Sequence, residues 1–238
     1  MESTADTALN DWFQGPLGVR VLREEAALAT LALDTVFGFE LLQVGAWGPA
    51  RHLLTAARTQ HTTLLAPELS AGVTLCAPLD TLPFRSDSID AILLPHTLEL
   101  VEDPYAVLRE AERVLTGEGC LMICGFNPYS GWGARRVFGR SFGRPAFPPH
   151  TQRMLSERRL RDWVALLGFD VDSVHGYLGF LPMKGGAAEV QPRRAMTAGA
   201  YLLKARKRVS TLTLVRPRRR VRQRVLVGAA EPTNKVAP

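Results

Sequence analysis

The sequence predicts an α/β protein, in which helices cover both faces of a doubly wound, mostly parallel sheet. Short apolar runs alternate with segments of helical periodicity, as they do in βαβ units. The run from Ser88 to Leu94 is apolar nearly throughout, as strands buried on both faces must be. Apolar residues make up 46% and charged residues 22% of the chain, which is typical of a globular protein and excludes a disordered chain.

The first half of the chain supplies most of the predicted sheet. Five short apolar segments are its predicted strands: 39–44, 62–65, 73–76, 88–94 and 121–125. Three segments of helical periodicity are its predicted helices: 17–36, 50–58 and 104–115. Asp103 and Pro104 provide the cap and the first turn of the last helix, and residues 116–119 form a turn before the last strand.

The second half begins with a segment rich in Gly, Pro and Arg over 129–150, which we expect to be a long loop. A helix follows over 156–167, capped by Ser156 and ended by Gly168, and then a strand over 169–174. Residues 201–207 and 210–215 are expected to form a last hairpin or long strand. The Gly-rich loop and residues 176–184 are the predicted lid over the substrate.

Charge is distributed unevenly along the chain. Residues 1–129 carry a net charge of −10, residues 130–198 carry +6 and residues 199–238 carry +10, which gives +6 for the whole chain. We expect one domain over 1–215, with a core over 39–128 and a lid and C-terminal part over 129–215, followed by a basic tail over 216–238 that is disordered. An anionic partner is expected to dock on the C-terminal side.

The remaining composition limits the class of protein. No apolar stretch reaches the 18 to 20 residues, roughly, that span a bilayer, and no secretory signal is visible, so we expect a cytoplasmic protein without membrane insertion. Cys76, Cys120 and Cys124 match no zinc or disulfide framework and are expected to be small buried residues. Their spacing predicts no metal site.

In open α/β sheets ligands bind at the carboxyl ends of the strands, so the residues there are the candidates. Gly45 allows a tight turn after the first strand. Glu68 follows the second strand and can accept both hydroxyls of a ribose, or it is a surface glutamate in a turn. His96 follows the fourth strand and is a candidate general base, or a structural hydrogen bonder.

Several motifs in this region occur in a recognisable order. They are Thr81-Leu82-Pro83-Phe84, Asp87-Ser88-Ile89-Asp90, His96-Thr97-Leu98-Glu99, Asp103-Pro104, Leu108-Arg109-Glu110, Arg113-Val114-Leu115, Gly117-Glu118-Gly119 and Asn127-Pro128. With them the chain resembles the class I S-adenosylmethionine-dependent methyltransferases of the type 11 group, over residues 39–128 and more loosely over 129–215. The resemblance implies a Rossmann-like fold and S-adenosylmethionine as the cofactor.

The resemblance also implies roles for individual residues. Gly45, Ala46, Trp47 and Gly48 would lie against the methionyl part of the cofactor, and Glu68 would hold the ribose hydroxyls. Leu79, Asp80, Thr81 and Leu82 would line the adenine. His96 would lie near the methyl-transfer pocket, where the protein mostly aligns the donor with a small-molecule acceptor.

The first glycine motif departs from the family pattern. Gln43 stands where the family has an acid, Trp47 stands at the second glycine and Pro49 at the third. Gln43 can donate and accept hydrogen bonds but cannot neutralise the amino group of a zwitterionic ligand. Trp47 is expected either to fill the pocket or to stack on another group.

A second function from another class stays open at this point. Trp132, Phe138, Phe142 and Phe147 interleave with four arginines in the loop over 129–150, where they could stack on a planar acceptor or simply cover the sheet. Together with the arginines of 216–224, they also fit a degenerate methyltransferase-like scaffold that binds nucleic acid or another anionic partner.

Overall fold

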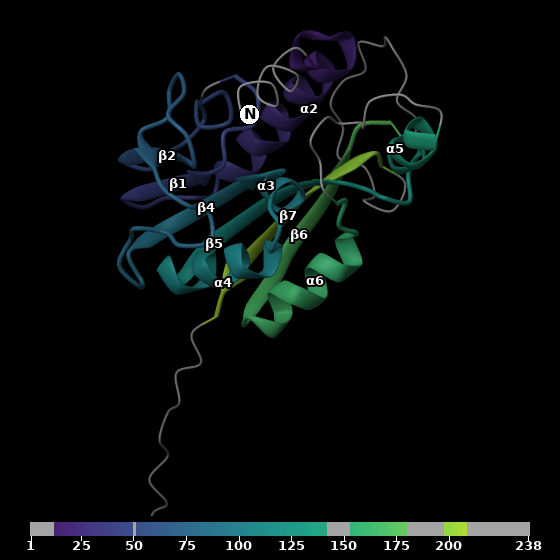
Figure 1. The fold of residues 1–238 in the computed structure, drawn as a ribbon. Helices are drawn as coiled ribbons and strands as arrows, with labels where there is room; N and C mark the ends of the chain where they lie inside the picture. The colour runs from purple at the N-terminus through teal and green to yellow at the C-terminus, as the bar shows by residue number, and fades with distance from the viewer. Residues whose placement is uncertain (1–11, 50, 142–152, 180–197, 209–238) are drawn as a thin grey trace, which may run out of the picture.

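The computed structural model of the protein describes residues 12–49, 51–141, 153–179 and 198–208. Within them a seven-stranded sheet has the order β3-β2-β1-β4-β5-β7-β6 (Figure 1). Its strands are β1 (Glu40–Val44), β2 (His61–Ala66), β3 (Leu75–Cys76), β4 (Ile89–Pro95), β5 (Leu115–Phe126), β6 (Phe169–Tyr177) and β7 (Ala200–Lys207). Only β7 runs antiparallel to its neighbours β5 and β6. The predicted mostly parallel sheet is confirmed.

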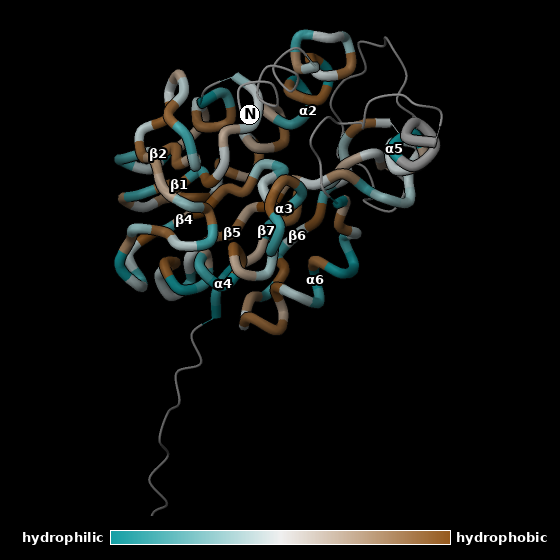
Figure 2. The backbone as a smooth tube through the Cα atoms, viewed as in Figure 1, coloured by the Kyte–Doolittle hydropathy of each residue, from teal (hydrophilic) through white to brown (hydrophobic). Residues whose placement is uncertain are grey.

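Helices cover both faces of this sheet. Helix α2 (Pro16–Leu33) lies on one face, and α3 (Thr97–Leu100), α4 (Pro104–Val114) and α6 (Glu157–Leu166) lie on the other (Figure 1). Neighbouring residues on β1 point to opposite faces: Leu41 joins the core under α2, and Leu42 joins the core under α4 and α6. The tube in Figure 2 is accordingly brown, or hydrophobic, along much of the central strands β4 and β5.

The predicted helix boundaries have clear local causes. The side chain of Asp103 accepts hydrogen bonds from the backbone N–H groups of Tyr105, at 3.0 Å, and Ala106, at 3.1 Å, and so caps α4. Ser156 caps α6 in the same way through the N–H of Arg159, at 3.3 Å. Gly168, with a φ of +85°, follows the end of α6. These three predictions are confirmed.

The helix expected over 50–58 is wrong, because residues 51–56 form a series of turns. Gly48 and Arg51 have φ angles of +69° and +62°, which a right-handed helix does not allow. Local hydrogen bonds stabilise the turns instead, between Nδ1 of His52 and the carbonyl of Pro49, at 2.8 Å, and from the Thr55 hydroxyl to the carbonyl of His52, at 3.1 Å.

The expectation of a continuous loop over 129–150 is also wrong, because α5 (Gly131–Ser141) is a helix. Ser130 starts this helix. Its hydroxyl accepts a hydrogen bond from the N–H of Trp132 at 3.2 Å, and its carbonyl accepts one from the N–H of Ala134 at 3.0 Å. Trp132 is buried rather than available to an acceptor. It stacks on Phe126 at 5.6 Å between ring centroids and donates to the carbonyl of Gly179 at 3.0 Å. This tertiary anchor outweighs the unfavourable composition.

Strand lengths differ in detail from the predictions. β3 has two residues, whereas β5 begins at Leu115 and includes the expected turn over 116–119. The prediction that all three cysteines are buried is wrong for Cys76, which is exposed because it lies on the edge strand β3. Cys120 and Cys124 lie in the core under α2, as their even spacing on β5 predicted.

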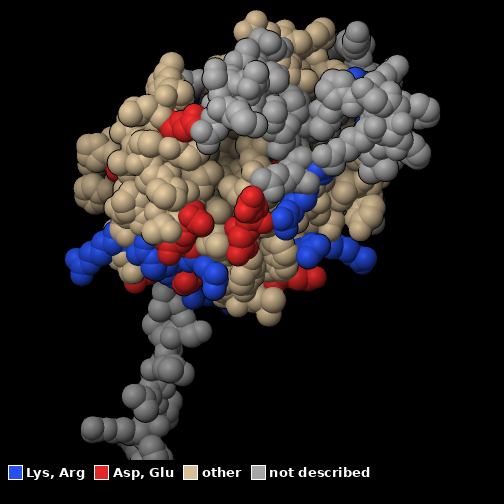
Figure 3. All heavy atoms as spheres, in the orientation of Figure 1, with Lys and Arg blue, Asp and Glu red and all other residues tan. Residues whose placement is uncertain are grey.

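The C-terminal part of the chain completes the sheet through β6 and β7. Residues 142–150, 180–184 and 210–238, which include parts of the predicted lid and hairpin and the whole basic tail, lie outside the described residues. In Figure 3 acidic and basic side chains are interspersed along the lower part of the visible face, where α4 and α6 lie. None of the described helices is both long and apolar enough to cross a membrane.

Candidate functional site

The carboxyl ends of β1, β2 and β4 meet along one edge of the sheet, and the predicted site residues follow them. Gly45 directly continues β1, and its N–H donates to the carbonyl of Leu65 on β2 at 2.8 Å. Glu68 lies two residues beyond β2 with an exposed side chain. His96 directly follows β4. The fold therefore brings these three segments together at the edge where ligands bind in such sheets.

The turn at Gly45 requires glycine. Its φ of +93° lies in a region that side chains disfavour, and a Cβ there would lie 2.7 Å from Oγ1 of Thr97. The Thr97 hydroxyl in turn donates to the carbonyl of Val44. The backbone after β1 is thus packed tightly against the start of α3, and this contact fixes the ends of β1 and β4 relative to each other.

Trp47 is part of an aromatic cluster at this edge. Its side chain is 2% exposed, and its ring lies 4.6 Å from that of Phe13 and 4.2 Å from that of His96. The ring centroids of Trp12 and Phe126 each lie 6.2 Å from that of Trp47. Trp47 therefore packs on other rings in tilted and edge-on contacts, and its burial agrees with both expectations. The indole Nε1 is buried without a hydrogen-bond partner among the described residues.

His96 is completely buried and held from several sides. Its Nδ1 lies 2.7 Å from Oε2 of Glu99, and its Nε2 lies 3.2 Å from the Tyr177 hydroxyl and 3.5 Å from Oε1 of Glu25. The ring also packs on Phe126, with 4.3 Å between centroids. The backbone of His96 has a φ of +52°, an uncommon conformation for a residue other than glycine that often marks functional sites.

The two carboxylates change the protonation of this cluster. Burial by itself lowers the pKa of His96, but the charges of Glu25 and Glu99 and the hydrogen bond that the imidazole donates to Glu99 outweigh it, so the pKa is raised above the ordinary 6.5. Burial also raises the pKa of Glu99, whose Oε1 accepts from the N–H of Phe126 at 2.8 Å. The pKa of the Tyr177 hydroxyl is raised strongly by burial. The arrangement can therefore hold a proton between buried groups.

Glu25 and Tyr177 were missed by the sequence analysis. Glu25 lies in α2 at helical spacing from the buried Val21, Leu28 and Ala29, so that it falls on the apolar face. A carboxylate on the apolar face of an amphipathic helix is a signal that could have identified it. Tyr177 gives no comparable signal, because an aromatic residue at the end of a strand is ordinary.

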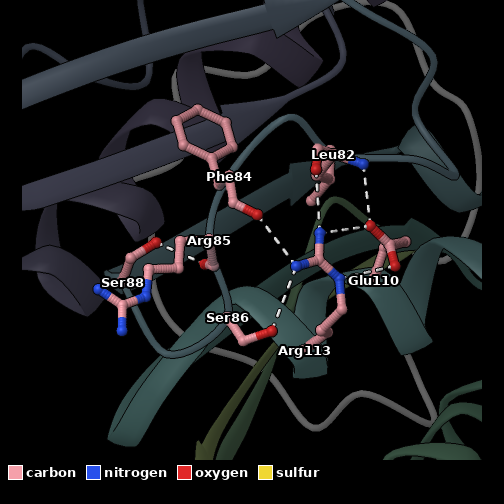
Figure 4. A network of polar contacts seen from close by, with 7 residues as sticks. All are labelled: Leu82, Phe84, Arg85, Ser86, Ser88, Glu110 and Arg113. Carbon is pink, nitrogen blue, oxygen red and sulfur yellow. Dashed lines mark hydrogen bonds and ion pairs between the residues drawn. The ribbon is translucent and has the colours of Figure 1, made fainter.

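The segment predicted to line the adenine is held by α4 (Figure 4). The N–H of Leu82 donates to Oε2 of Glu110 at 2.9 Å, and Arg113 donates to the carbonyls of Leu82 and Phe84, each at 2.9 Å. Arg113 also forms an ion pair with Glu110 at 2.8 Å. In this segment the side chain of Leu82 is buried and that of Leu79 is half-buried, whereas Asp80, Thr81 and, at the first turn, Ala46 are exposed. Gly48 is half-buried.

Comparison with known proteins matches this region to a family. The type 11 family described as a methyltransferase domain matches residues 40–123, from the start of β1 into β5. Over the longer span, protein YafS of Escherichia coli (strain K12), itself uncharacterised, is 32% identical over 206 residues, which are 84% of this chain and 82% of YafS. The chain belongs to the class I S-adenosylmethionine-dependent methyltransferases of the type 11 group. The predicted family, enzyme type and cofactor are confirmed.

Two further relatives of this methyltransferase illustrate how far the likeness extends. A malonyl-[acyl-carrier protein] O-methyltransferase of Halorhodospira halophila is 35% identical over 75 residues, which are 32% of this chain and 25% of that protein. The crystal structure of a methyltransferase from Thermotoga maritima, described as a possible histamine N-methyltransferase, superposes with a TM-score of 0.59 and 19% identity. The match covers 83% of this chain and 93% of that one, and it shows the fold alone.

The residues at the end of β1 fit the zwitterionic part of S-adenosylmethionine. Four buried side-chain atoms near this edge have no hydrogen-bond partner in the described part of the chain: Oε1 and Oε2 of Glu25, Oε1 of Gln43 and Nε1 of Trp47. Buried polar groups without partners are rare in native proteins and call for a water, ion or ligand that completes them. Here they comprise acceptors for an ammonium group and one donor for a carboxylate.

Proposed function

We propose that this methyltransferase transfers the methyl group of S-adenosylmethionine to a small-molecule acceptor. The observation that carries the proposal is the group of unpartnered buried polar atoms on Glu25, Gln43 and Trp47, beside the glycine turn after β1. These atoms lie where class I methyltransferases are expected to hold the cofactor. We infer a small-molecule acceptor from the methyltransferase type, because the fold by itself identifies no substrate.

The proposed cofactor contacts follow the order of the strands. Gly45, Ala46, Trp47 and Gly48 would contact the methionyl part, because the backbone there approaches the end of β4 closely. The exposed carboxylate of Glu68 would accept the two ribose hydroxyls. Leu79, Asp80, Thr81 and Leu82 would surround the adenine, and their backbone is held in place by Glu110 and Arg113.

The cofactor supplies a sulfonium that activates its methyl group, so the protein needs no nucleophile of its own. The chain aligns the reacting groups and excludes water from them. We assign His96 as the general base for an acceptor that must lose a proton. Glu99 would hold a proton on Nδ1, so that Nε2, which lies 3.2 Å from the Tyr177 hydroxyl, would be the atom that accepts the proton of the substrate. Because the pKa of His96 is raised, this base becomes free at a higher pH than an ordinary histidine does.

A labelling experiment tests the proposed function. The purified full-length protein is incubated with S-adenosylmethionine that carries a labelled methyl group and with a small-molecule extract of the cells that produce it. We expect label in the small-molecule fraction and S-adenosylhomocysteine as the second product, both lost in the His96→Gln variant. Cofactor binding without transfer to any small molecule would contradict the proposal and indicate a degenerate scaffold.

The alternative of a scaffold that binds an anionic partner depends largely on the arginines of 216–224. These residues lie outside the described part of the structure, and the comparisons give the alternative no support. Cytoplasmic localisation stays a prediction from the sequence.

A further inference from the structure

We propose that Glu25 of α2 binds the α-ammonium group of S-adenosylmethionine and so replaces the acid that this chain lacks at Gln43. The inference rests on the proposed function, because it requires the cofactor to bind at the end of β1. It goes beyond the family pattern, since it assigns the negative charge to a different element of the fold, the N-terminal helix.

Gln43 cannot supply the charge from its own position. Its Nε2 donates to the carbonyl of Gly45 at 3.0 Å, and its Oε1 is buried without a partner in the described residues. The amide oxygen can accept one hydrogen bond from an ammonium group, but it carries no charge to neutralise it. A buried ammonium without a counter-ion is costly, so a carboxylate from elsewhere is needed.

Glu25 is a buried carboxylate without a strong hydrogen bond among the described residues. Its side chain is 0% exposed, and neither oxygen has a hydrogen-bond partner among the residues that the structure describes. Its polar neighbours include Nε2 of His96, at 3.5 Å, the Tyr177 hydroxyl, and the thiol of Cys124, which is only a weak donor. The adjacent Glu24 is the opposite case, because it accepts from Nε of Arg20 and from the N–H of Leu178, each at 2.7 Å.

The charges around His96 leave Glu25 undercompensated. Two carboxylates, Glu25 and Glu99, face this one imidazole. Glu99 makes the close contact with the imidazole, 2.7 Å from Nδ1. It also accepts a hydrogen bond from the N–H of Phe126 and interacts with the charge of Arg136. Glu25 shares only the longer contact with the same ring. A second cation at Glu25 would therefore complete the cluster.

Glu25 is also linked to the turn that holds the methionyl part. His96, which Glu25 faces, packs on Trp47 at 4.2 Å between ring centroids, and Trp47 lies in that turn. The indole Nε1 of Trp47 is a buried donor without a partner in the described residues. One carboxylate and one N–H donor, both unsatisfied, match the ammonium and the carboxylate of a single amino-acid group.

Three probes separate these contacts in calorimetric titrations of the full-length protein. S-adenosylhomocysteine carries both the ammonium and the carboxylate, decarboxylated S-adenosylmethionine carries the ammonium and its sulfonium but no carboxylate, and 5′-methylthioadenosine carries neither the ammonium nor the carboxylate. We expect Glu25→Gln to weaken the binding of the first two probes about tenfold or more, as for a lost charge-assisted hydrogen bond, and to leave the third unchanged. Circular dichroism and the melting temperature without ligand show whether the variant is folded.

Matched variants test where the charge is needed. Gln43→Glu should restore binding of S-adenosylhomocysteine in the Glu25→Gln background but add little to the wild type, whose ammonium is already neutralised. Glu24→Gln is the control on the same helix, and it should leave the ratio of the affinities for S-adenosylhomocysteine and 5′-methylthioadenosine unchanged. If Glu25→Gln does not fold, Glu25→Asp serves instead, with the same selective loss expected because the carboxylate is withdrawn by one methylene.

The outcomes distinguish this inference from the proposed function. A folded Glu25 variant that binds all three probes as the wild type does would overturn the role of Glu25 and leave the cofactor site standing. An equal loss for all three probes would also overturn it, because it would indicate a structural role. If the wild type binds none of the probes, the proposed function fails, and this inference fails with it.

Discussion

Replacing Arg113 by alanine should loosen the segment that we assign to the adenine. Arg113 donates one hydrogen bond to the carbonyl of Leu82 and one to that of Phe84, each at 2.9 Å. Its side chain is 36% exposed, so solvent weakens each bond to about 1 kcal/mol rather than the larger value of a buried charged donor. The substitution should therefore lower the free energy of unfolding by about 2 kcal/mol.

The segment itself should report the change most directly. Hydrogen exchange should become faster at the N–H of Leu82, which donates to Glu110, and the affinity for S-adenosylhomocysteine should fall. Arg109→Ala is the matched control, because Arg109 lies on the same helix but is exposed beside the ring of Tyr105. The reasoning is refuted if Arg113→Ala changes the free energy of unfolding by less than about 0.5 kcal/mol, as an ordinary surface substitution does. It is also refuted if the N–H of Leu82 exchanges no faster in Arg113→Ala than in the Arg109→Ala control.

Three further substitutions test other parts of the site. Gly45→Ala should lower the free energy of unfolding by about 2 kcal/mol and abolish binding of S-adenosylhomocysteine, because the new Cβ would lie 2.7 Å from Oγ1 of Thr97; an unchanged melting temperature would contradict the strained turn. Trp47→Ala should cost about 3 to 5 kcal/mol in urea denaturation, since it empties a buried aromatic site, and a cost under about 1 kcal/mol would mean that the ring does not support the fold. Because the pKa of His96 is raised in the folded protein, its charged form stabilises the protein fully below pH 6.5, and this effect is lost as the pH rises through the folded-state pKa. The difference in the free energy of unfolding between the wild type and His96→Gln should therefore shrink above pH 6.5. A difference that stays constant there would exclude a charged His96.

The elements that could be predicted from the sequence are those whose cause is local. Mostly apolar runs such as Ile89–Pro95 predict buried strands, because a central strand of a parallel sheet is covered on both faces. The caps at Asp103 and Ser156 use their own side chains. Helix α5 could not be predicted, because contacts of Trp132 with residues distant in sequence hold it against a Gly-rich composition. The turns over 51–56 depend on positive φ angles that composition does not reveal.

The candidate site was predictable to the same extent. Gly45 and His96 were identified because they follow strands whose carboxyl ends share one edge of the sheet. Glu25 was missed because it reaches His96 from a helix that precedes β1, a contact that only the packing of α2 on the sheet creates. Trp47 was recognised as a departure from the family pattern, but its contact with the His96 ring could not be derived from the sequence.

The most direct test of the central claim is a calorimetric titration of the purified protein with S-adenosylmethionine and S-adenosylhomocysteine, with Glu68→Ala as the control. The account predicts binding in the micromolar range for the wild type and loss of that binding in the control, because Glu68 would hold the ribose hydroxyls. No heat of binding and no thermal stabilisation at millimolar ligand would contradict it and would indicate a methyltransferase fold that no longer holds its cofactor.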